Sequence, residues 1–313
     1  MPVAAPQIGR EPLPPFTRRD LPALGLTRHE LDALLLSGAV VQPVRGAYLD
    51  ARLADDATAR AGAVGLVLPV GAALAHRTAA WLHGIDPRGP GELQTPLDVE
   101  CLVPLGDSVP RRAGLVARQS ALPASDVVTL SGVPVTTPER TALDLARYAK
   151  RFMALALLDA FAGAKLVTTE ALAARLEELK GQRGVAQART LTEWTDPAAE
   201  SFGESWLRLR ILDAGFPRPE LQIWMRDETG LGIYRLDLGW PHLKVAVEYD
   251  GVEFHTSPEH RLRDMRRRER LARDWGWHCI GVGKGEVLGQ SLRLERGIGE
   301  LMGMSPQILR RTW

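Results

Sequence analysis

The feature that most constrains the fold is a short apolar segment, residues 243–249, that ends among acidic residues. Its last two residues begin the motif Glu248-Tyr249-Asp250-Gly251, and the preceding apolar segment, 234–240, contains Asp237. Apolar strands of this kind are buried on at least one face. Because an unpaired buried carboxylate costs several kcal/mol or has a strongly shifted pKa, these acids need a divalent cation, a basic side chain or access to water.

The spacing of these acids predicts how they meet. If residues 241–244 form the loop of a hairpin, Asp237 lies opposite Glu248 with Cβ atoms about 5 Å apart, and Asp250 shares the face of Glu248 about 7 Å away. Such oxygen ligands suit Mg²⁺ (or Mn²⁺), which keeps positions for water and phosphate oxygens. The pattern predicts a metal site at Asp237 and Glu248 for phosphodiester hydrolysis. The alternative is a hairpin whose acids pair with nearby arginines.

Length and composition set wider bounds. A chain of 313 residues is expected to hold two or three domains. The net charge of +1 neither requires nor excludes nucleic acid. The two cysteines, Cys101 and Cys279, lie in different segments, which argues against a disulfide framework or a zinc site. No signal peptide or long apolar run is evident, so we expect a cytoplasmic protein without membrane contact.

Residues 16–49 have the pattern of a small DNA-binding module. Thr17 can cap a short helix that ends at Leu24, and Thr27-x-x-Glu30 is a capping box for a second helix. Residues 40–49 then predict two short strands, a wing. Arg28 and His29, at the start of the second helix, are placed to contact base edges. Arg18 and Arg45 are further candidates for nucleic-acid contact, and the alternative is a helical pair that binds protein or nothing.

Three segments resemble a known family. They are Phe16-Thr17-Arg18-Arg19-Asp20-Leu21 with Arg45-Gly46-Ala47-Tyr48-Leu49, then residues 75–85, and residues 135–146. Together they resemble AbiEi-type antitoxins, autoregulating repressors of bacterial type IV toxin–antitoxin systems. The resemblance implies duplex DNA as a partner and a toxin encoded nearby. His76 and His83, on one face of a helix in this region, have no third ligand near them and are expected to pack.

The last third of the chain predicts an α-β-β-β-α-β order. The expected helices are 201–214 and 258–274, and the expected strands are 220–224, 234–240, 243–249 and 277–282. This order, with Glu204-Ser205, Asp237, Glu248-Tyr249-Asp250-Gly251 and Gly276-Trp277, resembles the PD-(D/E)XK nuclease core, and most closely its Vsr-like branch.

This second resemblance implies roles for the acids. Asp237 and Glu248 would bind Mg²⁺, the Tyr249 carbonyl would add a ligand, and Glu204 would hold metal-bound water unless it only caps its helix. Asp250 stands where the superfamily has lysine. The missing function would then fall to His255, whose pKa is near neutrality, or to Lys244 or Lys284.

An arginine-rich helix is expected beside this site. Residues 261–273 contain a run of arginines, among which Arg263, Arg266 and Arg267 are candidates to grip phosphates. A solvated face is the alternative interpretation.

The sequence thus predicts a multidomain α/β protein. The expected parts are a winged-helix DNA-binding-like domain (1–50), an AbiEi-like middle α+β region (51–137), a helical connector (138–198) and a Vsr-like PD-(D/E)XK nuclease-fold α/β domain (199–313). The expected function is a Mg²⁺-dependent DNA endonuclease or nickase. The alternative is a non-catalytic DNA-binding regulator or antitoxin, and an RNA target is not excluded.

Overall fold

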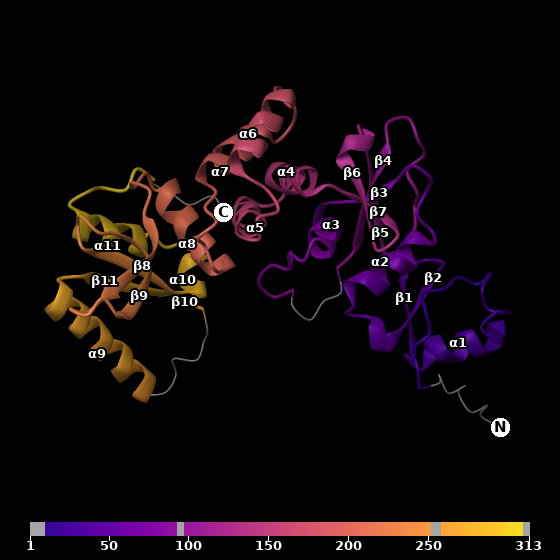
Figure 1. The fold of residues 1–313 in the computed structure, drawn as a ribbon, viewed down its shortest axis with the longest axis horizontal. Coiled ribbons are helices and arrows are strands. Elements are labelled where there is room, and N and C mark those ends of the chain that lie inside the picture. The colour runs from indigo at the N-terminus through magenta and orange to yellow at the C-terminus, as the bar shows by residue number, and fades with distance from the viewer. Residues whose placement is uncertain (1–9, 93–96, 252–257, 309–313) are drawn as a thin grey trace. The chain divides into compact units, whose positions relative to one another are not determined.

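The computed structural model describes residues 10–92, 97–251 and 258–308 (Figure 1). Contacts between the described residues divide the chain into two compact units, Met1–Leu145 and Ala146–Trp313. The described part holds eleven α-helices and three β-sheets, which confirms the mixed α/β class. The four predicted domains divide the chain more finely and stay a prediction.

The N-terminal unit begins with a helix and a two-stranded wing. Helix α1 (Arg28–Leu36) has the predicted capping box, since Thr27 Oγ1 accepts the Glu30 N–H and Glu30 Oε2 accepts the Thr27 N–H. Strands β1 (Val40–Val44) and β2 (Ala47–Asp50) pair antiparallel, as expected for a wing.

The predicted helix from Thr17 to Leu24 is wrong. This segment forms successive turns, in which the Thr17 N–H and hydroxyl both donate to the Asp20 carboxylate. Pro22 has no N–H to continue a helix and disfavours helical geometry at the residue before it. The turns still bury Leu21, which packs with Phe16, Tyr48 and the apolar side of α1.

A five-stranded sheet forms the rest of the N-terminal unit, with strand order β5-β4-β3-β7-β6. Its core is an apolar cluster between the sheet and helix α2. The elements are η1 (Ala51–Leu53), α2 (Ala57–Gly65), β3 (Ala73–Leu74), α3 (His76–Leu82), β4 (Val99–Pro104), β5 (Leu115–Ser120), η2 (Ala124–Asp126), β6 (Val127–Leu130) and β7 (Val133–Thr136), followed by α4 (Pro138–Tyr148), whose last residues belong to the second unit.

The two histidines of this unit lie where packing predicts. His76 is 5% exposed at the start of α3, and burial lowers its pKa. The His83 ring lies against the backbone of β7, with Nε2 2.8 Å from the Thr136 carbonyl oxygen. Both side chains therefore pack against the rest of this unit.

The C-terminal unit begins with helices and continues into a four-stranded sheet of order β11-β10-β9-β8. The predicted α-β-β-β-α-β order is confirmed, whereas the last two helices were not predicted. The elements are α5 (Arg151–Gly163), α6 (Thr169–Glu178), α7 (Val185–Trp194), α8 (Phe202–Asp213), β8 (Glu220–Arg226), β9 (Gly232–Trp240), β10 (Val245–Asp250), α9 (Pro258–Trp275), β11 (His278–Gly283), α10 (Lys284–Val287) and α11 (Arg293–Met302).

Helices cover both faces of this sheet. In Figure 1, α9 lies below the sheet and α8 above it. Leu271 of α9 packs with Ala246 and Trp277 on one side, and Trp206 and Leu207 of α8 pack with Val245 and other residues on the opposite side. Helix α9 connects the parallel strands β10 and β11, so it is the crossover that such a pair requires.

A buried ion pair joins helices α5 and α8. The side chains of Asp159 and Arg208 are 1% and 0% exposed, and the Ser205 hydroxyl donates to the same carboxylate at 2.6 Å. Because a charge without its partner is expensive at such depth, this pair fixes α5 against α8.

Among the described residues, no helix combines the length and the apolar character needed to cross a membrane.

Candidate functional site

The β9–β10 hairpin brings the predicted acids together. Trp240 pairs with Val245, and Leu238 pairs with Val247, which is the predicted register. Asp237 comes next in this register, and its Oδ2 accepts the Tyr249 N–H at 2.8 Å. Glu248 is only 6% exposed. The sequence therefore located both the hairpin and the juxtaposition of its acids.

Glu204, in the first turn of α8, was predicted to act with these acids, but its carboxylate already forms hydrogen bonds that cap the helix. The Ser201 hydroxyl accepts the Glu204 N–H and donates to Glu204 Oε1 at 2.9 Å. Glu204 Oε2 accepts the Glu200 N–H at 3.0 Å and the Gln222 side-chain amide at 2.8 Å. These bonds favour the capping role over the positioning of water.

Burial raises the pKa of Glu204, Asp237 and Glu248. The charge of Asp237 raises the pKa of Glu204 and of Glu248 further, and Asp250 acts in the same way on Asp237. The three carboxyls and Asp250 thus form one electrostatically coupled group, which we call the acidic cluster. Such a group needs positive charge nearby.

Arginines of helix α9 supply that charge. The Arg267 guanidinium binds Glu248 through both nitrogens, with Nη2–Oε1 at 2.6 Å and Nη1–Oε2 at 3.0 Å. It also donates to the Arg235 carbonyl at 3.1 Å and lies 5.5 Å from the centre of the Tyr234 ring. Arg268 lies 3.7 Å from Asp250. Arg267, predicted to contact nucleic acid, is thereby engaged by protein groups while a third of its side chain stays exposed.

This arrangement does not fit a divalent cation as it stands. Both oxygens of Glu248 and one oxygen of Asp237 already accept protein N–H groups. Over the described ranges, no group of three or more His, Cys, Asp or Glu side chains is placed to hold a metal. The ligation of Mg²⁺ by Asp237 and Glu248 therefore stays a prediction, and so does a catalytic role for Asp250.

Two of the proposed substitutes for the missing lysine, Lys244 and Lys284, lie at opposite ends of the β10–β11 pair. Lys244 lies in the turn before β10, and its ammonium is 5.4 Å from the centre of the Trp277 ring, a cation–π contact. Lys284 is exposed at the start of α10, directly after Gly283, which pairs with Asp250 of the acidic cluster. His255 lies outside the described residues, so its predicted role is open.

The arginines of α9 differ in their partners. Arg270 and Arg273 bind Asp274, whereas Arg263 and Arg266 are exposed and form no ion pair with any described residue. Arg263 and Arg266 therefore remain available for contact with phosphates.

The predicted nucleic-acid contacts of the N-terminal unit lie on its surface. Arg28 and His29 are exposed in the first turn of α1, and Arg45 is exposed in the turn between β1 and β2. Arg18 is partly engaged, because its Nε donates to the Tyr48 hydroxyl at 2.9 Å and its guanidinium lies 3.8 Å from Asp32. Arg28 and Arg45 therefore have the least competition from protein carboxylates.

Sequence reasoning missed one pair of arginines beside the wing. Arg111 and Arg112 are exposed in the loop before β5, and the Arg112 guanidinium donates to the Arg45 carbonyl at 3.3 Å. The only sequence signal is the adjacent pair after Pro110, and nothing local indicates which part of the fold this loop meets.

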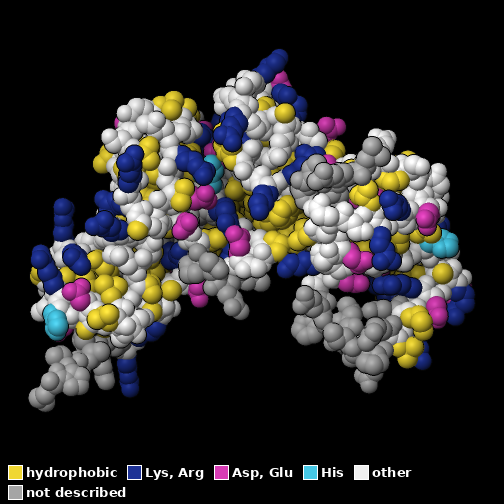
Figure 2. Space-filling model, turned by 180° about the vertical axis from the view of Figure 1, so that it is seen from behind, with side chains coloured by type: hydrophobic (Ala, Val, Ile, Leu, Met, Phe, Trp, Pro, Cys, Tyr) yellow, Lys and Arg dark blue, Asp and Glu magenta, His cyan; other side chains and the backbone are white. Residues whose placement is uncertain are grey.

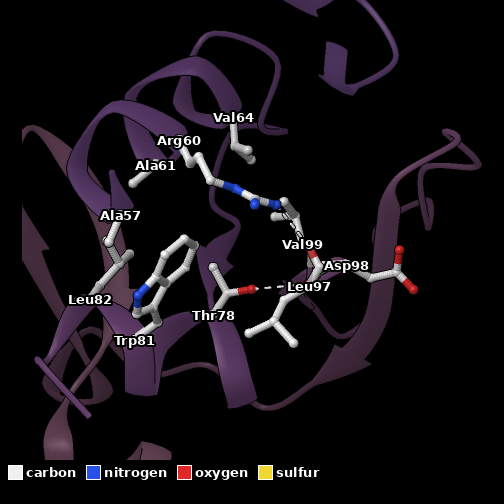
Figure 3. Close-up of a pocket in the computed structure, with 10 residues that line it drawn as sticks. All are labelled: Ala57, Arg60, Ala61, Val64, Thr78, Trp81, Leu82, Leu97, Asp98 and Val99. Carbon is white, nitrogen blue, oxygen red and sulfur yellow. Dashed lines mark hydrogen bonds between the residues drawn. The ribbon is translucent and has the colours of Figure 1, made fainter. Parts of the chain in front are cut away.

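A pocket between α2, α3 and the segment before β4 holds a buried cation (Figure 3). The Arg60 guanidinium lies 5.2 Å from the centre of the Trp81 ring and donates to the Leu97 carbonyl at 2.8 Å. The space left is about 10 Å³, which is room for about one water molecule. The pocket is therefore filled mainly by its own side chains.

Comparison with known proteins adds two findings. Residues 71–194 match the AbiEi antitoxin C-terminal domain, which confirms the resemblance at residues 75–85 and 135–146 and extends it through α7. The uncharacterized proteins MT2308 and Rv2248, from two strains of Mycobacterium tuberculosis, are each 31% identical over 257 residues, which is 82% of this chain and 90% of the relative. No solved structure matches.

The matched stretch between this chain and the mycobacterial proteins includes most of both sequences. The chain therefore belongs to the same family as these mycobacterial proteins, and within it residues 71–194 are the part that matches the AbiEi antitoxin C-terminal domain.

Proposed function

We propose that the protein is a non-catalytic, DNA-binding regulator of the antitoxin type, which binds duplex DNA through its N-terminal helix and wing. The match of residues 71–194 to the AbiEi antitoxin C-terminal domain carries this proposal. The same match makes DNA near its own gene the proposed target, and a toxin encoded nearby the proposed partner.

The surface of the N-terminal unit supports DNA as the ligand. Arg28 and Arg45 are exposed and form no ion pair with any described residue, so binding a phosphate would break no protein bridge. Arg88, in contrast, binds Asp86 at 2.7 Å. Because much of the affinity for DNA comes from phosphate contacts and released counterions, arginines without a carboxylate partner are the ones expected to contribute.

Replacing Arg28 with alanine is expected to weaken binding to a duplex from the region upstream of the gene about tenfold, since a base-edge or phosphate contact is lost. Fluorescence anisotropy at fixed salt measures this change. Arg88→Ala is the matched control, because its guanidinium is already neutralised by Asp86, and it should bind like the unaltered protein. The proposal fails if the unaltered protein prefers this duplex no more than an unrelated duplex of equal length.

A second candidate function, a Vsr-like PD-(D/E)XK endonuclease or nickase, is favoured by one observation. The elements from α8 to β11 have the α-β-β-β-α-β order that this candidate requires, and the register of the β9–β10 hairpin directs Asp237 and Glu248 toward one another. For hydrolysis, Arg267 would first have to leave Glu248 so that the carboxylate became free.

Plasmid nicking in millimolar Mg²⁺ or Mn²⁺ separates the two candidates. If the protein is a non-catalytic regulator, we expect the same background of nicked product from the unaltered protein, Asp237→Ala and Glu248→Ala. If it is a nuclease, we expect the unaltered protein to form nicked product and both variants to form none, although circular dichroism shows that the variants are folded.

A further inference from the structure

The loop before β5 lies directly against the turn of the wing. The Arg45 N–H donates to the Ala113 carbonyl at 3.0 Å, and the Arg112 guanidinium donates to the Arg45 carbonyl at 3.3 Å. Residues 111–114 are far from the wing in sequence and fall within the stretch that matches the AbiEi domain. The turn of the wing and this loop are thus joined by hydrogen bonds from both sides.

Gly114 makes this close approach possible. Its φ is +80°, and a Cβ atom there would lie 2.2 Å from the Pro43 carbonyl oxygen. Only glycine fits a backbone of that conformation at that distance. The position of the loop on β1 is therefore determined by the backbone itself, which holds the neighbouring arginines beside the wing.

The contact places Arg112 on the turn that carries Arg45, and Arg111 is the neighbour of Arg112 in the chain. Arg45, Arg111 and Arg112 are all exposed, and none of them forms an ion pair with a described residue. Residues 1–145 contain no lysine, so the blue side chains that protrude from this unit, at the left of Figure 2, are arginines. Elsewhere in the unit, Arg52 and Arg140 are bound to carboxylates.

We infer that Arg45, Arg111 and Arg112 form one phosphate-binding surface for duplex DNA, which we call the wing–loop surface. This inference rests on the proposed function and deepens it. The AbiEi-type region supplies part of the DNA interface, so binding is not confined to the helix and wing of the first fifty residues. Guanidinium groups bind phosphate oxygens through two parallel N–H donors, and such contacts carry no sequence information.

The test compares the whole chain with Arg111→Ala/Arg112→Ala across a range of salt concentrations. The double variant should bind about tenfold more weakly, equally on the upstream duplex and on an unrelated duplex, because phosphate contacts are common to both. The slope of log affinity against log salt should fall by about two, one for each lost contact. The variant Arg111→Lys/Arg112→Lys keeps both charges and should retain most of the slope.

Each outcome decides a separate question. If the unaltered protein binds no DNA, the proposed function fails. If it binds and the alanine double variant keeps the same affinity and slope, the wing–loop surface is wrong while the proposed function stands. An unchanged slope with loss on the upstream duplex alone would mean base contacts, which also overturns the phosphate-binding assignment.

Discussion

Replacing Asp159 with alanine is expected to destabilise the C-terminal unit by about 3–5 kcal/mol, the usual cost of removing one member of a buried ion pair. The change leaves the Arg208 guanidinium, 0% exposed, without its carboxylate. Its Nε atom has no partner among the described residues even before the change, and the Trp194 carbonyl is the acceptor that remains. The Asp196 N–H, 2.8 Å from Asp159 Oδ1, loses its acceptor as well.

Thermal unfolding of the whole chain measures this effect, which should lower the midpoint of the C-terminal unit by roughly 10 °C. Asp213→Ala is the control on the same pair of helices. It breaks the Arg151–Asp213 bridge, whose side chains are 24% and 16% exposed, and should cost only about 1 kcal/mol. Equal costs for the two variants would show that burial does not set the strength of the Asp159–Arg208 pair.

Features encoded by neighbouring residues were predicted well. The capping box at Thr27 and Glu30 depends on a three-residue spacing, and the register of the β9–β10 hairpin depends on the length of one turn. In both, the interacting groups are brought together by the local backbone. The predicted helix at Thr17 is the instructive failure, because Thr17 is a residue type that caps helices while Pro22, which has no N–H, opposes the helix that would follow.

Contacts between segments that are distant in sequence could not be predicted, because no local pattern specifies which segments meet. The acids of the hairpin needed a partner, and metal, arginine and water were all compatible with the local pattern. Arg267 becomes the partner of Glu248 because of the way α9 crosses the sheet, which brings the Arg267 guanidinium from α9 to Glu248 on β10. The meeting of Arg112 with the wing depends likewise on the path of the loop before β5.

The wing–loop surface and the acidic cluster use arginine differently. On the wing–loop surface the guanidinium groups have no carboxylate partner among the described residues, so an external phosphate can bind them without competition. At the acidic cluster, Arg267 and Arg268 neutralise the acids of the hairpin. This contrast makes Arg267 the residue that separates the two candidate functions.

Arg267→Met is expected to destabilise the C-terminal unit by about 2–3 kcal/mol, because Glu248 is left buried and charged without its partner. The cost is smaller than for Asp159→Ala, since the Arg267 side chain is 33% exposed and water screens its charge. Methionine keeps the apolar stem that lies near the Tyr234 ring. Adding Glu248→Gln should restore most of the stability, since an amide costs far less to bury than an unpaired carboxylate.

Unfolding of Arg267→Met with Mg²⁺ or with a chelator then tests the metal directly. If Arg267 is the permanent partner of the acidic cluster, the variant is equally unstable under both conditions, and only Glu248→Gln rescues it. If the cluster is a metal site covered by Arg267, Mg²⁺ restores the stability, by about 2.7 kcal/mol at a concentration one hundred times its dissociation constant. Rescue by Mg²⁺ would contradict a purely structural role for the cluster. As a control, the rescue should disappear in Arg267→Met/Asp237→Asn, because Asp237 is the second predicted ligand.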